Sequence, residues 1–406
     1  MGPDGALALV SNGNWTEEYL DGTVMLVDLV ALHERIDEGA CREVDDQTRC
    51  DIAEVSDPDA TVRPGTGVGN IVLDRPAGPD GPLRALLPVR TPNSITWIDV
   101  VTESGAPRLS CGQGDDRICA DANRVRVGGP DGSLRLPGEP GRIELDDQGF
   151  RFLYVPHLGG GNLSLISLDG EQGPELSDVE AEFYQPTPDA TGDLAGGFAV
   201  AQRACDPEDP PSSTRDCERP LLYGSQRYFP GMRAFTVAPG LELILPGGDV
   251  PVQTLDPALV DSHPFMGDVA FEEPATGEHM LIVQTTPAAL LRLDMTLDDT
   301  GRPRGEVLGS VPLCANPNVL TIDRPADGPA LALVACFSEG LVAAVDLATF
   351  RVVGLIEVGE GASEITLDPV RRVAYVTAVG ADQVAIVSLD RARADYLTVR
   401  AFLDNG

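Results

Sequence analysis

The chain contains no lysine, so arginine supplies all 29 of its basic residues against 64 acidic ones. The formal net charge of −35 argues against nucleic acid and anionic membrane surfaces as partners, because both require a basic face on the protein. No run of 18 apolar residues is present, so the sequence predicts no transmembrane helix. What remains is a chain whose charge favours solubility and cation binding.

The sequence also lacks the short motifs that identify common catalytic chemistries. It has no G-x-S-x-G, S-x-x-K or H-E-x-x-H motif, and no C-x-x-C-H site for the attachment of heme. These absences favour a protein that is not an enzyme and that needs no cofactor. Calcium stays open as a cofactor, because adjacent aspartates such as Asp298-Asp299 carry the oxygen ligands that it prefers.

Eight cysteines are present, and they fall into pairs that are close in sequence. The pairs are Cys41 with Cys50, Cys111 with Cys119, Cys205 with Cys217, and Cys314 with Cys336. Most of them lie in polar segments rich in proline or aspartate, where a free thiol would be exposed. We therefore expect four local disulfides and an oxidising compartment, with a set of buried thiols as the alternative.

Two copies of one pattern fill the chain from Asn316 to the C-terminus. Asp323 in the first copy aligns with Asp368 in the second, and Val345-Asp346-Leu347 aligns with Val387-Ser388-Leu389. The repeat length of roughly 40–45 residues is typical of propeller blades. Each copy divides into short apolar runs separated by turn residues, as in a four-stranded antiparallel blade.

The sequence therefore predicts an all-β fold, a single β-propeller domain over residues 1–406 with seven four-stranded antiparallel blades. We expect an incomplete first blade, because the chain begins in the middle of a repeat. The missing upstream part would carry an export signal, a lipid anchor and the innermost strand of that blade. The expected blades cover residues 1–60, 61–128, 129–186, 187–256, 257–315, 316–360 and 361–406.

Three segments near the C-terminus follow a known pattern: Tyr375-Val376-Thr377, the strand from Val384 to Leu389, and the outer strand from Val352 to Gly359. Through them the last two copies resemble the YVTN-type β-propeller repeats of bacterial and archaeal surface proteins. Ala378 stands where that family has asparagine. The resemblance implies a seven-bladed propeller that is extracellular, periplasmic or on the bacterial outer-membrane surface. It implies no particular reaction.

Propellers usually bind ligands at one mouth of the central channel, where loops from several blades meet. The expected loops place these candidates there: Asn93, His157, Arg227, Tyr228, His263, Asn316, Glu339 and Glu364. His157 begins a glycine-rich loop and His263 precedes a blade, so the two imidazoles and Glu364 are candidate metal ligands. The alternative is that both histidines are ordinary loop residues hydrogen-bonded to the backbone.

These observations predict an exported, disulfide-bonded propeller that acts as a binding or scaffold module. Its partner would be a protein or an extracellular polymer. The alternative is a metal-assisted hydrolase, similar to a lactonase, with its site at the mouth of the channel.

Overall fold

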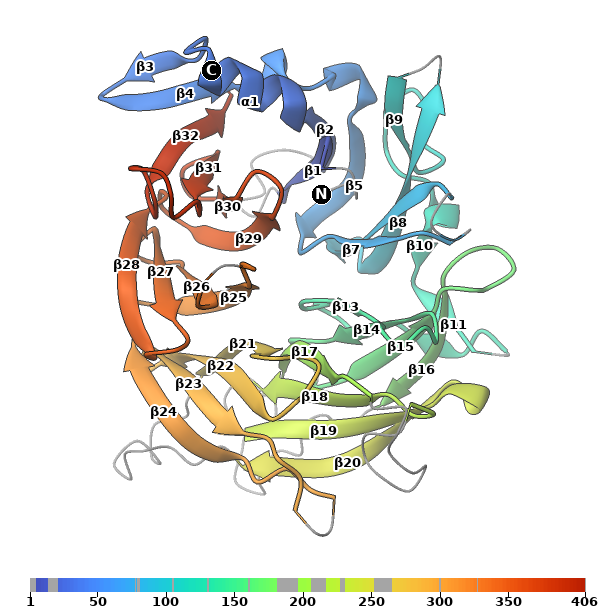
Figure 1. Ribbon diagram of the computed structural model, residues 1–406. Helices are drawn as coiled ribbons and strands as arrows, with labels where there is room; N and C mark the ends of the chain where they lie inside the picture. Colours follow the sequence, from blue (N-terminus) through green and yellow to red (C-terminus); the bar gives the residue numbers. More distant parts are fainter. Residues whose placement is uncertain are drawn as a thin grey trace.

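A computed structural model describes most of the chain. The described residues are 5–13, 21–76, 78, 81–103, 106–129, 131–159, 161–180, 196–205, 217–226, 231–251, 265–298, 301–326 and 328–405. Within these ranges the strands form six hydrogen-bonded sheets. The sheets are arranged as a ring, with one edge of each sheet toward the centre (Figure 1). The all-β prediction is confirmed, and the arrangement is that of a β-propeller.

The first two sheets come from the N-terminal half. One has the order β1-β2-β5-β7-β8-β10, with β6 paired to β7 and β9 to β8, and the other has the order β12-β11-β16-β15-β14-β13. The strands of the first are β1 (Leu7–Asn12), β2 (Gly22–Asp28), β5 (Val62–Val68), β6 (Val72–Asp74), β7 (Leu83–Thr91), β8 (Ser94–Glu103), β9 (Ala106–Ser110) and β10 (Arg124–Val125). Those of the second are β11 (Val127–Gly128), β12 (Leu134–Arg135), β13 (Glu144–Leu145), β14 (Phe152–Pro156), β15 (Leu163–Ser167) and β16 (Glu175–Glu180).

The next three sheets are regular four-stranded units in chain order. They consist of β17 (Gly197–Arg203), β18 (Leu221–Gln226), β19 (Gly231–Ala238) and β20 (Leu243–Pro251); β21 (Phe265–Phe271), β22 (His279–Thr286), β23 (Ala289–Asp294) and β24 (Glu306–Pro312); and β25 (Pro317–Asp323), β26 (Leu331–Cys336), β27 (Leu341–Asp346) and β28 (Arg351–Glu357). The last sheet has the order β29-β30-β31-β32-β4-β3. Its strands are β29 (Ala362–Asp368), β30 (Val373–Ala378), β31 (Gln383–Ser388), β32 (Val399–Asp404), β4 (Gln47–Asp51) and β3 (Arg42–Val44).

Helices are few in the described ranges. The one α-helix there is α1 (Leu29–Asp37), and the carboxylate of Asp28 accepts hydrogen bonds from the backbone N–H groups of Val30 and Ala31 to cap it. Short 3₁₀ helices also occur in these ranges, at Ile52–Glu54, Pro58–Ala60, Asp121–Asn123 and Pro239–Leu241.

The middle strands of the blades are apolar on both faces because each is covered by a neighbouring sheet on either side. Every residue of β26 is buried, from Leu331 to Cys336. Its side chains alternate between two hydrophobic clusters: Leu333 packs toward the sheet of β29, and Val334 toward the sheet of β21. This explains the continuous apolar runs in the sequence. They lack the alternation of apolar and polar residues that a strand with one solvent-exposed face shows.

Charged pairs join neighbouring blades beside these apolar contacts. The guanidinium of Arg372 donates two hydrogen bonds, of 2.8 and 2.7 Å, to the carboxylate of Asp323 at the end of β25. Arg151 makes the same kind of contact with Asp74 at the end of β6, at 2.6 and 3.1 Å. Asp323 and Asp74 thus each end an inner strand and accept an arginine from the next blade, whereas Asp368, the second repeated aspartate, accepts from Arg371 of its own blade at 2.8 Å.

A segment from the N-terminal region joins the outer edge of the last sheet. Strand β4 pairs in parallel with β32, the last strand of the chain, with Phe402 opposite Arg49. Arg42 and Arg49 both donate to the carboxylate of Asp404 at 2.8 Å. The Cys41–Cys50 disulfide joins the two ends of the β3–β4 hairpin. The N-terminal region thus extends the outer edge of the C-terminal sheet and covers β32, the last strand of the chain.

The first two expected blades, residues 1–60 and 61–128, differ from separate four-stranded sheets. Strand β5 pairs with β2 through Val62 and Gly65, and with β7 through Thr66 and Val68, so one sheet runs through both regions. Strand β1 is the innermost described strand of this sheet. All four disulfides form between the cysteine pairs expected from the sequence, and no cysteine is left free.

Candidate functional site

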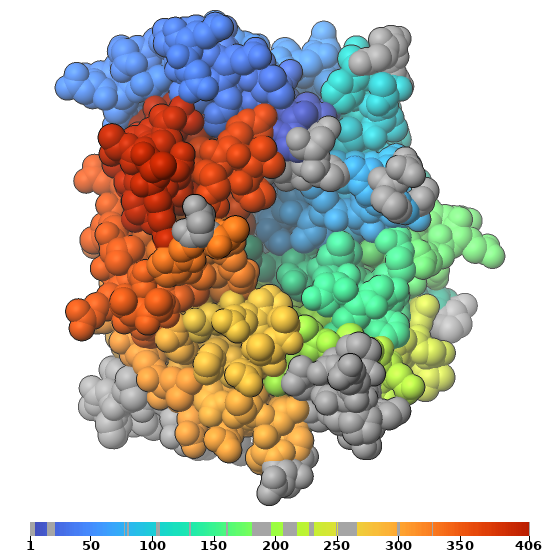
Figure 2. Space-filling view, in the orientation of Figure 1, coloured from blue at the N-terminus to red at the C-terminus, as the bar shows by residue number. Residues whose placement is uncertain are grey.

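A large cavity occupies the centre of the ring, and the hollow is visible in Figure 2. It has a volume of about 640 Å³, within the usual range for small-molecule sites. Its polar lining comes from the inner strands of several blades, including Asn70, Arg142, Glu144, Asn318 and Glu364. Inner strands of a propeller lie side by side around the channel, so residues far apart in sequence meet there.

The centre of the polar group is Arg142, which lies two residues before the start of β13. Its Nε lies 3.2 Å from Oδ2 of Asp268 in an ion pair, and its Nη1 donates to Oε1 of Glu364. Each of the three residues stands immediately before an isoleucine or valine in or next to its inner strand: Ile143, Val269 and Ile365. This shared position in the repeat brings them to one level of the channel.

Backbone contacts fix the strand that carries Arg142. Asn70 of the preceding blade accepts from the backbone N–H of Ile143 at 3.0 Å and donates to the carbonyl of Ile143 at 2.9 Å. On the other side, the N–H of Arg142 donates to the carbonyl of Phe198 at 3.0 Å. A Cβ at Gly141 would lie 2.8 Å from that carbonyl oxygen, so the close approach of the two chains requires glycine.

Asp268 holds Arg142 from the protein interior. Its side chain is 8% exposed. Its carboxylate also accepts from the backbone N–H groups of Val269 at 3.0 Å and Leu320 at 3.1 Å. Burial raises the pKa of Asp268, and the charge of Arg142 and these hydrogen bonds act in the opposite direction. Asp268 is a positioning group, because it does not line the cavity.

Glu144 lies in the cavity wall two residues beyond Arg142, and its pKa is raised far above the usual value of a glutamate. Burial raises its pKa to about 8, with a further rise from the negative charge of Asp268, while Arg142 opposes the shift. The Glu144 carboxyl forms no hydrogen bond to the described residues. A carboxyl group that titrates near neutral pH inside a cavity has the acidity needed to accept and return a proton.

The remaining charges of the site belong to Arg142 and Glu364. Burial lowers the pKa of Arg142, but the charges of Asp268 and Glu364 outweigh it and raise the pKa, so the guanidinium stays protonated. Burial raises the pKa of Glu364, with Arg142 opposing. The Nη2 group of Arg142 has no hydrogen-bond partner among the described residues, so two N–H donors remain for a ligand.

Of the residues that the sequence predicted for a site, the structure places Glu364 in the cavity. His157 lies outside its lining and is fully buried. The Nε2 of His157 lies 2.9 Å from the Ser164 hydroxyl and its Nδ1 lies 3.3 Å from the carbonyl of Gly138. Burial lowers the pKa of His157 to about 4, so the imidazole is neutral at pH 7.

The other predicted residues do not join this group. Asn93 donates to the carbonyls of Leu136 and Pro137 at 2.9 and 3.0 Å. The carbonyl of Asn316 accepts from the N–H of Phe337, and the Glu339 carboxylate accepts from the N–H of Ala315 at 3.0 Å. None of the three lines the cavity. Arg227, Tyr228 and His263 lie outside the described residues.

Sequence reasoning missed Arg142, Glu144 and Asp268. The usable signal was a charged residue in or next to an inner strand, as in Arg142-Ile143-Glu144-Leu145 and Asp268-Val269-Ala270-Phe271. Inner strands face the channel, so a charge there needs a partner from another blade. No short motif contains the set, because Arg142 and Glu144 come from one repeat and Asp268 comes from another.

The described residues do not fit a metal ion in this site. They include no group of three histidine, cysteine, aspartate or glutamate side chains arranged to hold one. Asp268 and Glu364 converge on the guanidinium of Arg142, which takes the place that a cation would have between them. Calcium, open as a cofactor from the sequence, therefore has no donor set in the described channel.

No family model matches the chain, and no curated protein matches it in sequence. By structure it is similar to a putative 6-phosphogluconolactonase of Bacteroides fragilis, with a TM-score of 0.61, 13% identity, and 100% of this chain and 97% of that one covered. It is also similar to the periplasmic gluconolactonase PpgL of Pseudomonas aeruginosa, with a TM-score of 0.60, 14% identity, and 98% and 97% covered.

A further neighbour is the dihydro-heme d1 dehydrogenase NirN, with a TM-score of 0.53 and 13% identity over 99% of this chain. The chain spans 64% of the length of that structure. At these identities the similarity establishes the β-propeller fold. The described part of the chain contains no helix that is long and apolar enough to cross a membrane.

These neighbours correct the first functional prediction. A binding or scaffold module was expected because the sequence has no catalytic motif, yet the similar structures bear the names of enzymes, two of them lactonases. The prediction failed because propeller sites are assembled from single residues on separate blades, which leaves no local motif to find.

Proposed function

We propose that the protein is a hydrolase of lactones or similar cyclic esters, with its active site in the central cavity around Arg142 and Glu144. The observation that carries the proposal is a glutamate in the cavity whose pKa is about 8, beside a guanidinium with N–H groups left for a ligand. The lactonase names of the structural neighbours support the same class of reaction.

The proposed reaction uses the ionised Glu144 as a general base. Its carboxylate removes a proton from a water molecule as the water oxygen attacks the lactone carbonyl carbon. Nη2 of Arg142 donates hydrogen bonds to the negative charge that develops on the carbonyl oxygen. The ring C–O bond then breaks, and the protonated Glu144 returns its proton to the leaving oxygen. The product is a hydroxy acid, and no other reactant is required.

Asp268 and Glu364 support this step by holding the guanidinium from two directions. Loss of Asp268 would let the Arg142 side chain move in the cavity. Because the described residues do not fit a metal ion, the proposed step is carried by this chain's own charged groups.

The proposal is tested by measuring hydrolysis of δ-lactones with the purified chain and with Glu144→Gln. Gln keeps the shape of the side chain and cannot take the proton, so kcat/KM should fall by about 100-fold or more. Glu339→Gln is the matched control, since Glu339 does not line the cavity and its substitution should leave kcat/KM unchanged. Equal activity of wild type and Glu144→Gln would refute the role of Glu144.

We further propose that the ring has seven blades, with the first two sharing one sheet through β5, and that it belongs with the YVTN-type repeat propellers. Tyr375 and Thr377 of the repeat both line the cavity, which supports a link between the repeat and the site. The four disulfides and the periplasmic gluconolactonase neighbour support an exported, periplasmic location.

A further inference from the structure

The cavity that holds the charged group continues into an apolar region between the first and last sheets. Its wall there is formed by residues of β1, β2, α1, β30, β31 and β32. They are Ala8, Val10, Val27, Leu29, Leu32, Tyr375, Val384 and Leu403. All eight also belong to, or pack against, one hydrophobic cluster of the core. We call this region the apolar limb.

The apolar limb is unusual because a propeller normally packs its inner strands tightly between neighbours. All residues of β1 are only half-buried, apart from the exposed Asn12. In the equivalent strand β17 every residue is buried. The space beside Ala8 and Val10 is therefore part of the cavity, in place of packed side chains from an adjoining strand. An apolar space that opens on the polar site can accept an apolar part of the same ligand.

The two ends of the cavity differ sharply in chemistry. At the channel lie the charges of Arg142, Glu144 and Glu364. In the apolar limb, the described lining residues offer the Tyr375 hydroxyl as their polar side-chain group. That hydroxyl lies 2.7 Å from Nε2 of His33, so it is already engaged. Burial lowers the pKa of His33 to about 4, and the imidazole adds no charge to the limb at neutral pH.

We propose that the substrate is an amphipathic lactone, with its ester ring at Arg142 and an unbranched alkyl chain in the apolar limb. This inference rests on the proposed function for the position of the ring, and it adds the class of substrate. A sugar lactone, with hydroxyl groups on most of its carbons, would leave those groups without hydrogen-bond partners in the limb. An alkyl chain needs none and displaces water from apolar walls.

The test is a series of δ-lactones that carry the same ring and a side chain from methyl to heptyl. Each methylene that enters the limb should raise kcat/KM by about fourfold. The rise should stop when the chain exceeds the length of the limb. A flat or falling series would overturn the inference while leaving lactone hydrolysis itself intact.

A substitution that fills the apolar limb tests whether the alkyl chain of the substrate binds there. Ala8→Phe adds a phenyl ring to its wall, and the gain from heptyl over methyl should shrink by about 15-fold or more, equivalent to two lost methylenes. Val10→Phe, on the same face of β1, serves the same purpose if the first variant does not fold. Ala348→Phe places the same ring on the exposed turn after β27 and should keep the full dependence on chain length.

Calorimetric titration of the same lactones into the Glu144→Gln protein separates the two proposals. Affinity that increases with chain length, together with no hydrolysis by the wild type, would refute the catalytic proposal and support the apolar limb. Hydrolysis with affinity independent of chain length would refute the limb and support the catalytic site. Absence of both binding and hydrolysis would overturn both.

Discussion

Replacement of Arg142 by methionine tests whether the guanidinium stabilises the three neighbouring carboxylates, Glu144 and Glu364 in the cavity wall and Asp268 behind it. Methionine keeps most of the length of the side chain and removes the charge. Asp268, whose side chain is 8% exposed, would then face the interior as an unpaired carboxylate. Removing one partner of a buried ion pair typically costs about 3–5 kcal/mol, and we expect a loss of that order in the free energy of unfolding at pH 7.

The pH dependence of this loss identifies its cause. Burial already raises the pKa of Asp268 with Arg142 present, and the pKa rises further without it. A carboxyl group whose pKa is raised by folding favours the folded state while it is protonated. That contribution is complete below the unfolded pKa, about 4, and is lost as the pH rises through the folded pKa. The deficit of Arg142→Met should therefore be largest at neutral pH and shrink as the pH approaches 4.

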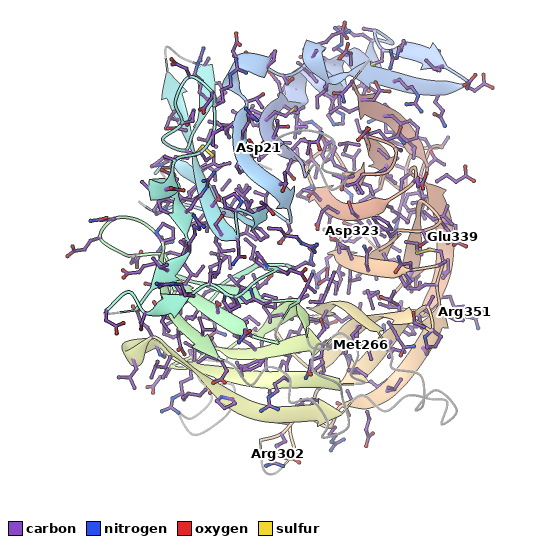
Figure 3. The ribbon with its side chains drawn as sticks, turned by 180° about the vertical axis from the view of Figure 1, so that it is seen from behind. Asp21, Met266, Arg302, Asp323, Glu339 and Arg351 are labelled. Carbon is purple, nitrogen blue, oxygen red and sulfur yellow. A yellow bond between two sulfur atoms is a disulfide. The ribbon has the colours of Figure 1, made fainter. Side chains whose placement is uncertain are left out.

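Urea unfolding at fixed ionic strength, with the disulfides intact, measures the free energy at each pH. The double variant Arg142→Met/Asp268→Asn should recover most of the loss at pH 7, since the unpaired charge is gone. Arg351→Met is the matched control: Arg351 is exposed at the periphery of the ring, where Figure 3 labels it. A deficit that is equal at pH 4 and pH 7, or no larger than that of the control, would refute the reasoning.

Further predictions concern the same cavity and the joints of the ring. Glu144→Gln should gain stability relative to wild type as the pH rises from about 4 to 8, because the pKa of Glu144 is about 8 in the folded state and its ionisation opposes folding; urea unfolding at both pH values checks this. Asp323→Asn should cost about 1.5–3 kcal/mol of unfolding free energy, because it removes a charged acceptor from two hydrogen bonds of Arg372. An unchanged urea midpoint would show that the Asp323–Arg372 pair does not stabilise the contact between the two blades. Replacing Cys41 and Cys50 by serine should cost about 2.5 kcal/mol, from the nine-residue separation, and should speed amide exchange in β32; normal exchange there would show that the hairpin does not secure the edge.

The all-β fold was largely predictable because it depends on patterns that are local in the sequence. Short apolar runs, turn residues and the repeated Asp323 and Asp368 define the strands and the blades. Cysteine spacing predicted the disulfides, since each pair lies in one loop or between adjacent strands. The pairing of β4 with β32 was not predictable, because it joins residues about 350 positions apart and the hairpin is polar and short.

The site was much harder to predict, for a physical reason. Arg142, Asp268 and Glu364 come from three repeats, and only closure of the ring brings them together. The prediction of a histidine site was wrong for His157. Histidine is rare in this chain and His157 begins a glycine-rich loop, but its ring is fully buried and contacts a backbone carbonyl and a hydroxyl group. Charge at an inner-strand position proved more informative than residue type, because a charge facing a channel must be matched from another blade.

The pH dependence of kcat/KM for δ-lactone hydrolysis tests the central claim most directly. With Glu144 as the general base, kcat/KM of the wild type should rise with pH and level off near pH 8, the pKa of that carboxyl. In Glu144→Gln the activity should be at least about 100-fold lower, and this step should be absent. A wild-type chain that hydrolyses no lactone, or a Glu144→Gln profile with the same step near pH 8, would contradict the account.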